Sequence, residues 1–176
     1  SRDLSYTFFK SLNIFLCSIL RCLCNRSIFS LTYPSISIRF LHSLFHITTQ
    51  PLPNLMKIRV LSIDLGVRRG KEHSIDKAKG VKCYTLYVFK SAALAKSSIG
   101  LNEVNAGDCL LVSPGSPHYL KSKDSEWEYD SISFKGSDAT RLVSQIGIEC
   151  DTVHSPLQTY FIDALLDKIL KEFRAT

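Results

Sequence analysis

One stretch constrains the fold more than any other: Gly107-Asp108-Cys109-Leu110-Leu111-Val112-Ser113-Pro114-Gly115-Ser116-Pro117-His118. Gly107-Asp108 is typical of a tight turn, because glycine tolerates a positive φ. Pro114-Gly115 predicts a second turn, in which proline presets φ and glycine takes the left-handed position. The apolar run Cys109–Val112 between them has the length of a buried strand, and His118 opens the next strand. A strand so closely bounded by turns predicts a mainly β fold.

The chain from Met56 onward continues this pattern of short strands and turns. We expect a loop over 66–80, a hairpin turn over 97–100, and strands over 57–65, 81–90, 92–96, 101–104, 109–112, 118–121 and 128–134. Strands at such short spacing suit a barrel or a sandwich. Two helices should follow. The first is capped by Ser137 and ends at Gly147, and the second starts at Leu157, after the cap and proline of Ser155-Pro156.

The stretch from Gly107 to His118 resembles the second sequence motif of the cupin barrels. A second segment, Glu126-Trp127-Glu128-Tyr129-Asp130-Ser131-Ile132-Ser133-Phe134-Lys135-Gly136, resembles a strand of the effector-binding and dimerisation domains of AraC-type transcriptional regulators. The resemblance extends from Met56 to the end of the chain. It implies a cupin-like jelly-roll β-barrel followed by two C-terminal α-helices, which is α+β overall.

This resemblance also implies a function. The domain would bind a small-molecule effector, a sugar or an organic acid, inside the barrel, form a homodimer in the cytoplasm, and use no cofactor. It would control DNA-templated transcription through a DNA-binding domain with helix-turn-helix motifs, which is missing from this sequence. No membrane partner is expected. The domain division is 1–55 for an N-terminal extension, 56–155 for the effector-binding barrel with its first helix, and 156–176 for a dimerisation or linker helix.

Residues 1–55 differ in composition from the rest of the chain. They contain no glycine, five Lys or Arg and one acidic residue, whereas residues 56–176 carry 17 Lys or Arg and 15 acidic residues. Three interpretations remain open: a transit peptide, a membrane anchor, or untranslated sequence before a true start at Met56, the only methionine. We favour the third, so this extension should not belong to the fold. No dense basic stripe indicates that the domain itself binds nucleic acid.

The cysteines and histidines exclude some site chemistries. Cys83, Cys109 and Cys150 lie in apolar runs and are expected to be buried free thiols of a reducing compartment. Metal-dependent cupins bind their ion with histidines and a carboxylate of a first motif and a histidine of the second. His118 matches the second-motif histidine, but the first-motif region, 83–103, contains no histidine. We therefore expect neither a bound metal ion nor enzymatic activity. A small metal-dependent cupin enzyme of the isomerase type is the alternative, and a barrel without a ligand is the third possibility.

Alternation along the strand over 128–134 separates two sets of side chains. By resemblance to the sugar-binding member of the family, the set containing Trp127 faces the effector. Ser131 and Leu120 replace two aromatic residues that contact the sugar there, which argues against arabinose itself, and Lys90 replaces an arginine. Tyr87 can add to an aromatic wall. The predicted ligand-binding residues are Lys90, His118, Leu120, Trp127, Tyr129, Ser131 and Ser133.

The last predicted helix carries a wide apolar stripe. Its residues recur at spacing four, and further leucines widen it beyond what one contact with the barrel needs. This stripe is a candidate dimer seam, and packing against the chain's own barrel is the alternative. The candidate dimerisation residues are Phe161, Leu165, Leu166, Ile169, Leu170 and Phe173.

Overall fold

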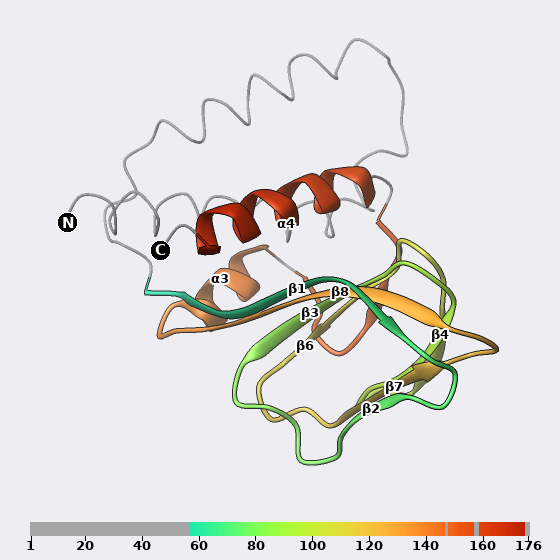
Figure 1. The fold of residues 1–176 in the computed structure, drawn as a ribbon. Coiled ribbons are helices and arrows are strands. Elements are labelled where there is room, and N and C mark those ends of the chain that lie inside the picture. The colour runs from blue at the N-terminus through green and yellow to red at the C-terminus, as the bar shows by residue number, and fades with distance from the viewer. Residues whose placement is uncertain (1–56, 147, 157–158, 175–176) are drawn as a thin grey trace, which may run out of the picture.

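The computed structural model describes residues 57–146, 148–156 and 159–174, so the predicted extension over 1–55 lies outside the described residues. Eleven elements follow one another in this part of the chain. Figure 1 shows how they are arranged. They are β1 (Arg59–Arg69), β2 (Ser74–Lys77), β3 (Tyr84–Phe89), β4 (Ala93–Lys96), β5 (Leu101–Val104), β6 (Cys109–Val112), β7 (His118–Ser122), β8 (Trp127–Lys135), α3 (Ala139–Ile146), β9 (Val153–His154) and α4 (Thr159–Arg174).

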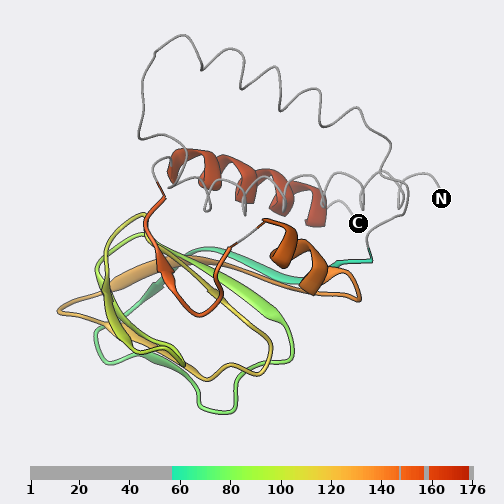
Figure 2. The same ribbon diagram turned by 180° about the vertical axis from the view of Figure 1, so that it is seen from behind.

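The strands form two antiparallel sheets that enclose a barrel. The five-stranded sheet has the order β1-β8-β3-β6-β9, and the four-stranded sheet has the order β2-β7-β4-β5. Helices α3 and α4 cover the outer face of the five-stranded sheet, on the side away from the four-stranded sheet (Figures 1 and 2). The prediction of a mainly β fold with a barrel followed by two helices is therefore confirmed.

Two hydrophobic clusters lie on opposite faces of the five-stranded sheet. Between the two sheets, inside the barrel, lie Tyr87, Phe89, Ala93, Ala95, Val104, Leu110, Val112, Leu120, Trp127 and Tyr129. Between the five-stranded sheet and the helices lies a larger cluster that includes Leu86, Val88, Leu111, Ile132, Phe134, Leu142, Ile162, Leu166 and Ile169. Strands β3 and β8 contribute to both clusters, because successive side chains of a strand point to opposite faces.

The two predicted turns form around β6 as expected. Gly107 has a φ of 93°, and its N–H donates to the Phe89 carbonyl at 2.7 Å. Gly115 has a φ of 82° in a turn closed by a 3.1 Å bond from Ser116 N–H to the Ser113 carbonyl. Gly80 packs directly on this second turn, since a Cβ atom there would lie 2.4 Å from the Gly115 carbonyl carbon. Both turns therefore depend on glycine for backbone conformation or for space.

The loop predicted over 66–80 is wrong, because it contains the end of β1 and all of β2. Strand β1 continues along β8 through an irregularity at Gly66, whose φ is 60°. The Gly66 N–H donates to the Asp130 carboxylate at 2.7 Å, so the bulge has its own partner on β8. Strand β2 pairs with β7 despite its charged surroundings. The short strand β9, which pairs with β6, was also not predicted.

Helix α3 begins two residues after its predicted cap, Ser137. The Asp138 carbonyl accepts the Leu142 N–H at 2.9 Å, so Asp138 is the residue at the start of the helix. Its carboxylate accepts the Lys57 N–H at 2.7 Å and pairs with Arg141 at 3.0 Å. These bonds tie the start of α3 to the chain entering β1. The predicted helix end at Gly147 and the second helix start at Leu157 lie outside the described residues.

Candidate functional site

The buried side chains of the inner surface are aromatic and aliphatic, and Asp64, an exposed residue whose charge acts on Tyr87, lies beside them. The large side chains of this surface come from β3, β6, β7 and β8, and Trp127, Phe89 and Leu120 are at most 1% exposed. No Lys or Arg is among the buried residues of the described part of the chain. The buried acids in the described ranges are Asp108, Asp130 and Asp151, and each carboxylate accepts a bond from a backbone N–H in a turn, bulge or loop.

A hydrogen bond crosses the barrel between the two sheets. Tyr87 Oη on β3 lies 3.2 Å from His118 Nε2 on β7, and His118 Nδ1 lies 3.2 Å from the Ser116 carbonyl. A carbonyl can only accept, so Nδ1 carries the proton and Nε2 accepts from the Tyr87 hydroxyl. Burial lowers the pKa of His118 below its ordinary value of 6.5 and raises the pKa of Tyr87. Both groups are therefore neutral in the barrel.

Aromatic rings line the path from this bond to the start of β8. The Tyr87 ring meets Tyr129 edge-on, with centroids 5.9 Å apart, and Tyr129 stacks on Trp127 at 4.9 Å. Tyr87 and Ser131 are register partners on β3 and β8, which places the buried Ser131 beside this row. Three residues of the predicted inward set, Trp127, Tyr129 and Ser131, therefore lie together with His118.

One polar atom of this aromatic row is unpaired. The indole Nε1 of Trp127 is buried, and no hydrogen-bond acceptor among the described residues reaches it. A buried donor without an acceptor is costly, because it loses its bond to water and gains none in return. In the described part of the chain it is the one buried side-chain nitrogen or oxygen atom without a partner. An acceptor brought within hydrogen-bond distance of Nε1 would remove that cost.

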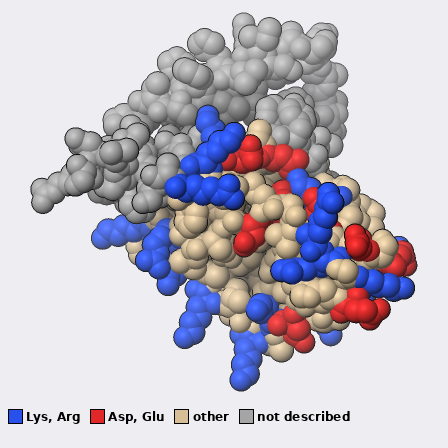
Figure 3. All heavy atoms as spheres, in the orientation of Figure 1, with Lys and Arg blue, Asp and Glu red and all other residues tan. Residues whose placement is uncertain are grey.

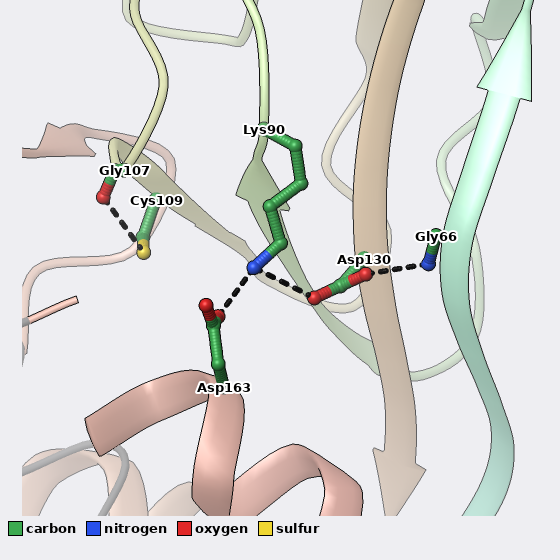
Figure 4. Close-up of polar contacts among 6 residues, drawn as sticks. All are labelled: Gly66, Lys90, Gly107, Cys109, Asp130 and Asp163. Atoms are coloured by element: carbon green, nitrogen blue, oxygen red, sulfur yellow. Dashed lines mark hydrogen bonds and ion pairs between the residues drawn. The ribbon is translucent and has the colours of Figure 1, made fainter. Parts of the chain in front are cut away.

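Lys90 lies on the other side of the sheet, although it was predicted to face the effector. Its Nζ is 3.1 Å from Asp130 Oδ2 and also contacts Asp163 of α4, as Figure 4 shows. The reason is alternation: Tyr87 and Phe89 point inward, whereas Leu86 and Val88 point toward the helices, and Lys90 continues the second series. Burial alone would lower the pKa of Lys90, but its bonds to Asp163 and Asp130 outweigh burial and raise it.

The group Lys90, Asp130 and Asp163, called the ion cluster below, joins three parts of the fold. Asp130 receives the Gly66 N–H of the β1 bulge through one oxygen and Lys90 through the other. The side chain of Asp130 is 8% exposed and that of Asp163 is 50% exposed. The sequence analysis did not predict this cluster, because it placed Lys90 by resemblance and did not apply alternation along 81–90, which separates Lys90 from Tyr87 and Phe89. The partner on α4 had no sequence signal.

The remaining predicted ligand-binding residues are Leu120 and Ser133. Leu120 is fully buried in the inner cluster, where it leaves no polar atom for a sugar. The Ser133 hydroxyl is 3.1 Å from the Thr85 hydroxyl of its register partner on β3. That bond lies farther along β8 than the Trp127–Tyr129 stack. Contact of Leu120 and Ser133 with an effector remains a prediction.

The apolar stripe of α4 packs largely on the protein's own sheet. Ile162, Leu166 and Ile169 are fully buried in the cluster shared with the sheet, and Leu165, Leu170 and Phe173 are partly buried against it. Leu166 is therefore a core residue, not a free contact for a second chain. The side chain of Phe161 lies outside the described part of the structure. A dimer through α4 remains a prediction, with the partly buried residues as its available contacts.

The outer surface carries shallow depressions and mixed charges. One depression of about 210 Å³ lies beside the ion cluster and is lined by Val88, Lys90, Ala106, Gly107 and Asp163. Another of about 230 Å³ lies over β2 and β7, lined by Lys71, Glu72, Ser74, Tyr119, Lys121, Ser122 and Lys123. On the face in Figure 3, basic side chains project with acidic ones between them. Neither depression opens among the aromatic rings of the inner surface.

The described residues give little support for a metal site, a reactive thiol or a membrane-spanning helix. No group of three or more His, Cys, Asp or Glu residues there could hold a metal ion. Cys109 is buried and its thiol lies 3.7 Å from the Gly107 carbonyl (Figure 4), but Cys83 and Cys150 are only half-buried, contrary to expectation. Burial raises the pKa of Cys109, and it raises the pKa of Cys150 to about 11, so both thiols stay protonated. None of the helices in the described ranges is long and apolar enough to cross a membrane.

Comparison with known structures gives loose likenesses. ToxT from Vibrio cholerae O395, solved with (E)-4-(8-methylnaphthalen-1-yl)but-3-enoic acid, is 15% identical over 67% of this chain and 49% of ToxT, with a TM-score of 0.48. The plu4264 protein from Photorhabdus luminescens is 13% identical over 44% of this chain and 65% of that chain, with a TM-score of 0.35. A cupin 2 conserved barrel domain protein from Salinispora arenicola is 16% identical over 56% of this chain and 92% of that chain, with a TM-score of 0.31. This chain thus spans less than two thirds of the first two proteins. No curated protein matches it.

The match to a family model is more specific. Residues 103–173 match the AraC-like ligand binding domain. The matched range starts in β5 and includes the two turns around β6, the inner residues of β7 and β8, both helices and Asp163 of the ion cluster. These are the parts of the sequence on which the resemblance to AraC-type regulators was recognised. Residues 103–173 of this chain are accordingly similar to the AraC-like ligand binding domain family.

Proposed function

We propose that this chain is the effector-sensing domain of a cytoplasmic AraC-type transcriptional regulator. A small molecule binds inside the barrel, against the aromatic row formed by Trp127, Tyr129, Tyr87 and His118. Binding alters a homodimer and, through it, a DNA-binding domain of the whole protein. The free cysteines among the described residues agree with a reducing compartment.

The observation that carries this proposal is the double role of β8. Its inner side presents Trp127, Tyr129 and Ser131 to the barrel, and Asp130 between them joins the ion cluster on the outer side. A ligand that displaces the inner side chains must move the backbone that carries Asp130. The ion cluster can pass this displacement to α4, because Lys90 contacts Asp130 and Asp163 at once. One strand thereby connects a ligand site with a helix at the surface.

The effector predicted from the resemblance is a sugar or an organic acid. The position of Lys90 weakens the case for an acid, since its charge is already matched by two carboxylates outside the barrel. A metal-dependent enzyme has less support, because both ring nitrogens of His118 are engaged in hydrogen bonds. The family model also describes ligand binding.

Fluorescence of Trp127, the only tryptophan, tests the proposal. A panel of sugars, organic acids and uncharged aromatic compounds is titrated into the full chain, and sedimentation follows its mass. At least one compound should change the emission, and the change should persist in Lys90→Ala, because Lys90 lies outside the barrel. The response of α4, followed by hydrogen exchange, should be lost in Lys90→Ala. A panel without any response would favour a barrel that binds no ligand.

A further inference from the structure

The buried Trp127 N–H and the lack of charged groups among the buried inner side chains together restrict the ligand. Resting on the function proposed above, we infer that the barrel takes an uncharged, flat and largely apolar compound, and that one hydrogen-bond acceptor of this compound, such as a carbonyl oxygen, faces Trp127 Nε1. This ligand class differs from the organic acid expected from the sequence. It also differs from a sugar, whose many hydroxyl groups each need a partner.

The charge argument comes first. An anion inside the barrel would need a cation or several N–H donors, because moving a charge into an apolar interior is expensive. No Lys or Arg is buried in the described ranges, and Lys90 faces the helices. His118 is neutral, since its Nε2 accepts from Tyr87 and burial lowers its pKa. A cation would find no buried carboxylate free, because the three buried aspartates are engaged in turns, the bulge and a loop. The remaining carboxylate near Tyr87 is that of Asp64, which is exposed to water.

The second argument counts the polar groups available to a ligand. Tyr87, His118 and Ser116 already bond one another across the barrel. Trp127 Nε1 has no partner among the described residues, and an indole nitrogen can only donate. The indole therefore supplies a donor that lacks an acceptor, and the inward hydroxyls of Tyr129 and Ser131, which can donate or accept, are the other polar groups of the aromatic row. The stacked rings of Trp127 and Tyr129 supply flat apolar walls beside it, which favours an aromatic or planar compound over a polyol.

Four probes provide the test. Acetophenone is neutral and has a carbonyl acceptor, and ethylbenzene lacks that acceptor. Benzoate is an anion, and L-arabinose is a polyol sugar. Dissociation constants for the full chain are measured by ligand-observed magnetic resonance. Acetophenone should bind roughly tenfold more tightly than ethylbenzene, the ratio that one recovered hydrogen bond gives. Benzoate and arabinose should bind more weakly than acetophenone. Trp127→Phe should reduce acetophenone binding to the level of ethylbenzene, and Tyr119→Phe, which removes a hydroxyl on the outer side of β7, should change nothing.

A measurement on the unaltered chain guards against a variant that fails to fold. Trp127 gives the single indole N–H resonance of the protein. Acetophenone should shift this resonance downfield, as a new hydrogen bond does, whereas ethylbenzene should not. If benzoate or arabinose binds more tightly than acetophenone, or if probes bind in the barrel without moving the indole resonance, the inference about the ligand class is wrong while the sensing function stands. If none of the four probes binds, the inference is also overturned, and the wider fluorescence panel then decides the sensing function.

Discussion

The two faces of the five-stranded sheet are built from the same strands but differ in chemistry. The inner face is aromatic and contains no ion pair in the described residues, and its polar groups bond across the barrel or stay unpaired. The outer face is mostly aliphatic apart from the stacked rings of Tyr84 and Phe134, is covered by α3 and α4, and has an ion cluster at one end. This difference suggests a division of roles, in which the inner face is adapted to bind a ligand and the outer face stabilises the fold. The predictions below test that division, beginning with the largest expected effect.

A charge on the outer face should unfold the domain. Leu166 is fully buried between α4 and the sheet, so Leu166→Glu loses apolar burial and places a carboxylate in the core. We expect a loss of at least about 3 kcal/mol in the free energy of unfolding. Urea unfolding followed by circular dichroism measures it. The dimer seam predicted from the sequence would instead give a stable monomer, so a folded Leu166→Glu chain of half the native mass would contradict this packing.

The ion cluster should contribute less to stability than the core, but more than a surface ion pair. Lys90→Met keeps the apolar stem and leaves Asp130 buried without its cation. The expected cost is about 2 kcal/mol, below the value for a fully buried pair because Lys90 is partly exposed. Lys90→Met with Asp130→Asn should recover most of this loss, since asparagine can still accept the Gly66 N–H. If the double variant is no more stable than the single one, the unpaired charge is not the cause.

Lys90 also shows where reasoning from the sequence succeeded and where it failed. The strands around β6 followed from turn residues and apolar runs, because Gly107 and Gly115 fix the backbone locally. The inward positions of Trp127, Tyr129 and Ser131 followed from alternation. Lys90 was assigned by resemblance to a relative, and alternation along its own strand, which places it with Leu86 and Val88, was not applied.

The other errors come from tertiary contacts that leave no local pattern. The end of β1 looks like a loop because it contains Gly66 and two arginines, yet pairing with β8 and the bond to Asp130 hold it in the sheet. Strand β9 is two residues long, too short for any periodicity. Asp163 lies on the polar side of an amphipathic helix, and only the packing of that helix on the sheet brings it to Lys90. The unpaired Trp127 N–H likewise depends on atoms from several strands.

The inner face should make stability depend on pH through His118. Burial lowers the pKa of His118 in the folded chain below the ordinary 6.5 of the unfolded chain. The unfolded state therefore binds more protons below pH 6.5, so stability is full above this pH and is lost as the pH falls through the lower folded value. His118→Gln keeps a hydrogen-bonding side chain that does not titrate. In this variant the urea concentration at the unfolding midpoint should change less between pH 7 and pH 5 than in the unaltered chain. An unchanged slope in this variant would assign the pH dependence to other groups.

The smallest expected effect is the difference in stability loss between removing a charge of the ion cluster and removing an ordinary surface charge of α4. Asp163 contacts Lys90 and is half-exposed. Asp167, one turn later, pairs with Lys171 of the same helix at 3.3 Å, and both of these side chains are largely exposed. We expect Asp163→Asn to cost roughly 0.5–1 kcal/mol and Asp167→Asn to cost about 0.3 kcal/mol or less, as exposed pairs do. Added salt should reduce the difference in stability between the two variants, because partly exposed ion pairs are screened.

The more informative readout is hydrogen exchange of α4 with a barrel ligand bound. If Asp163 connects the two faces of the sheet, Asp163→Asn should abolish the ligand-dependent change in exchange while the Trp127 signal persists. An equal response in both variants would mean that α4 senses the inner face through apolar packing alone.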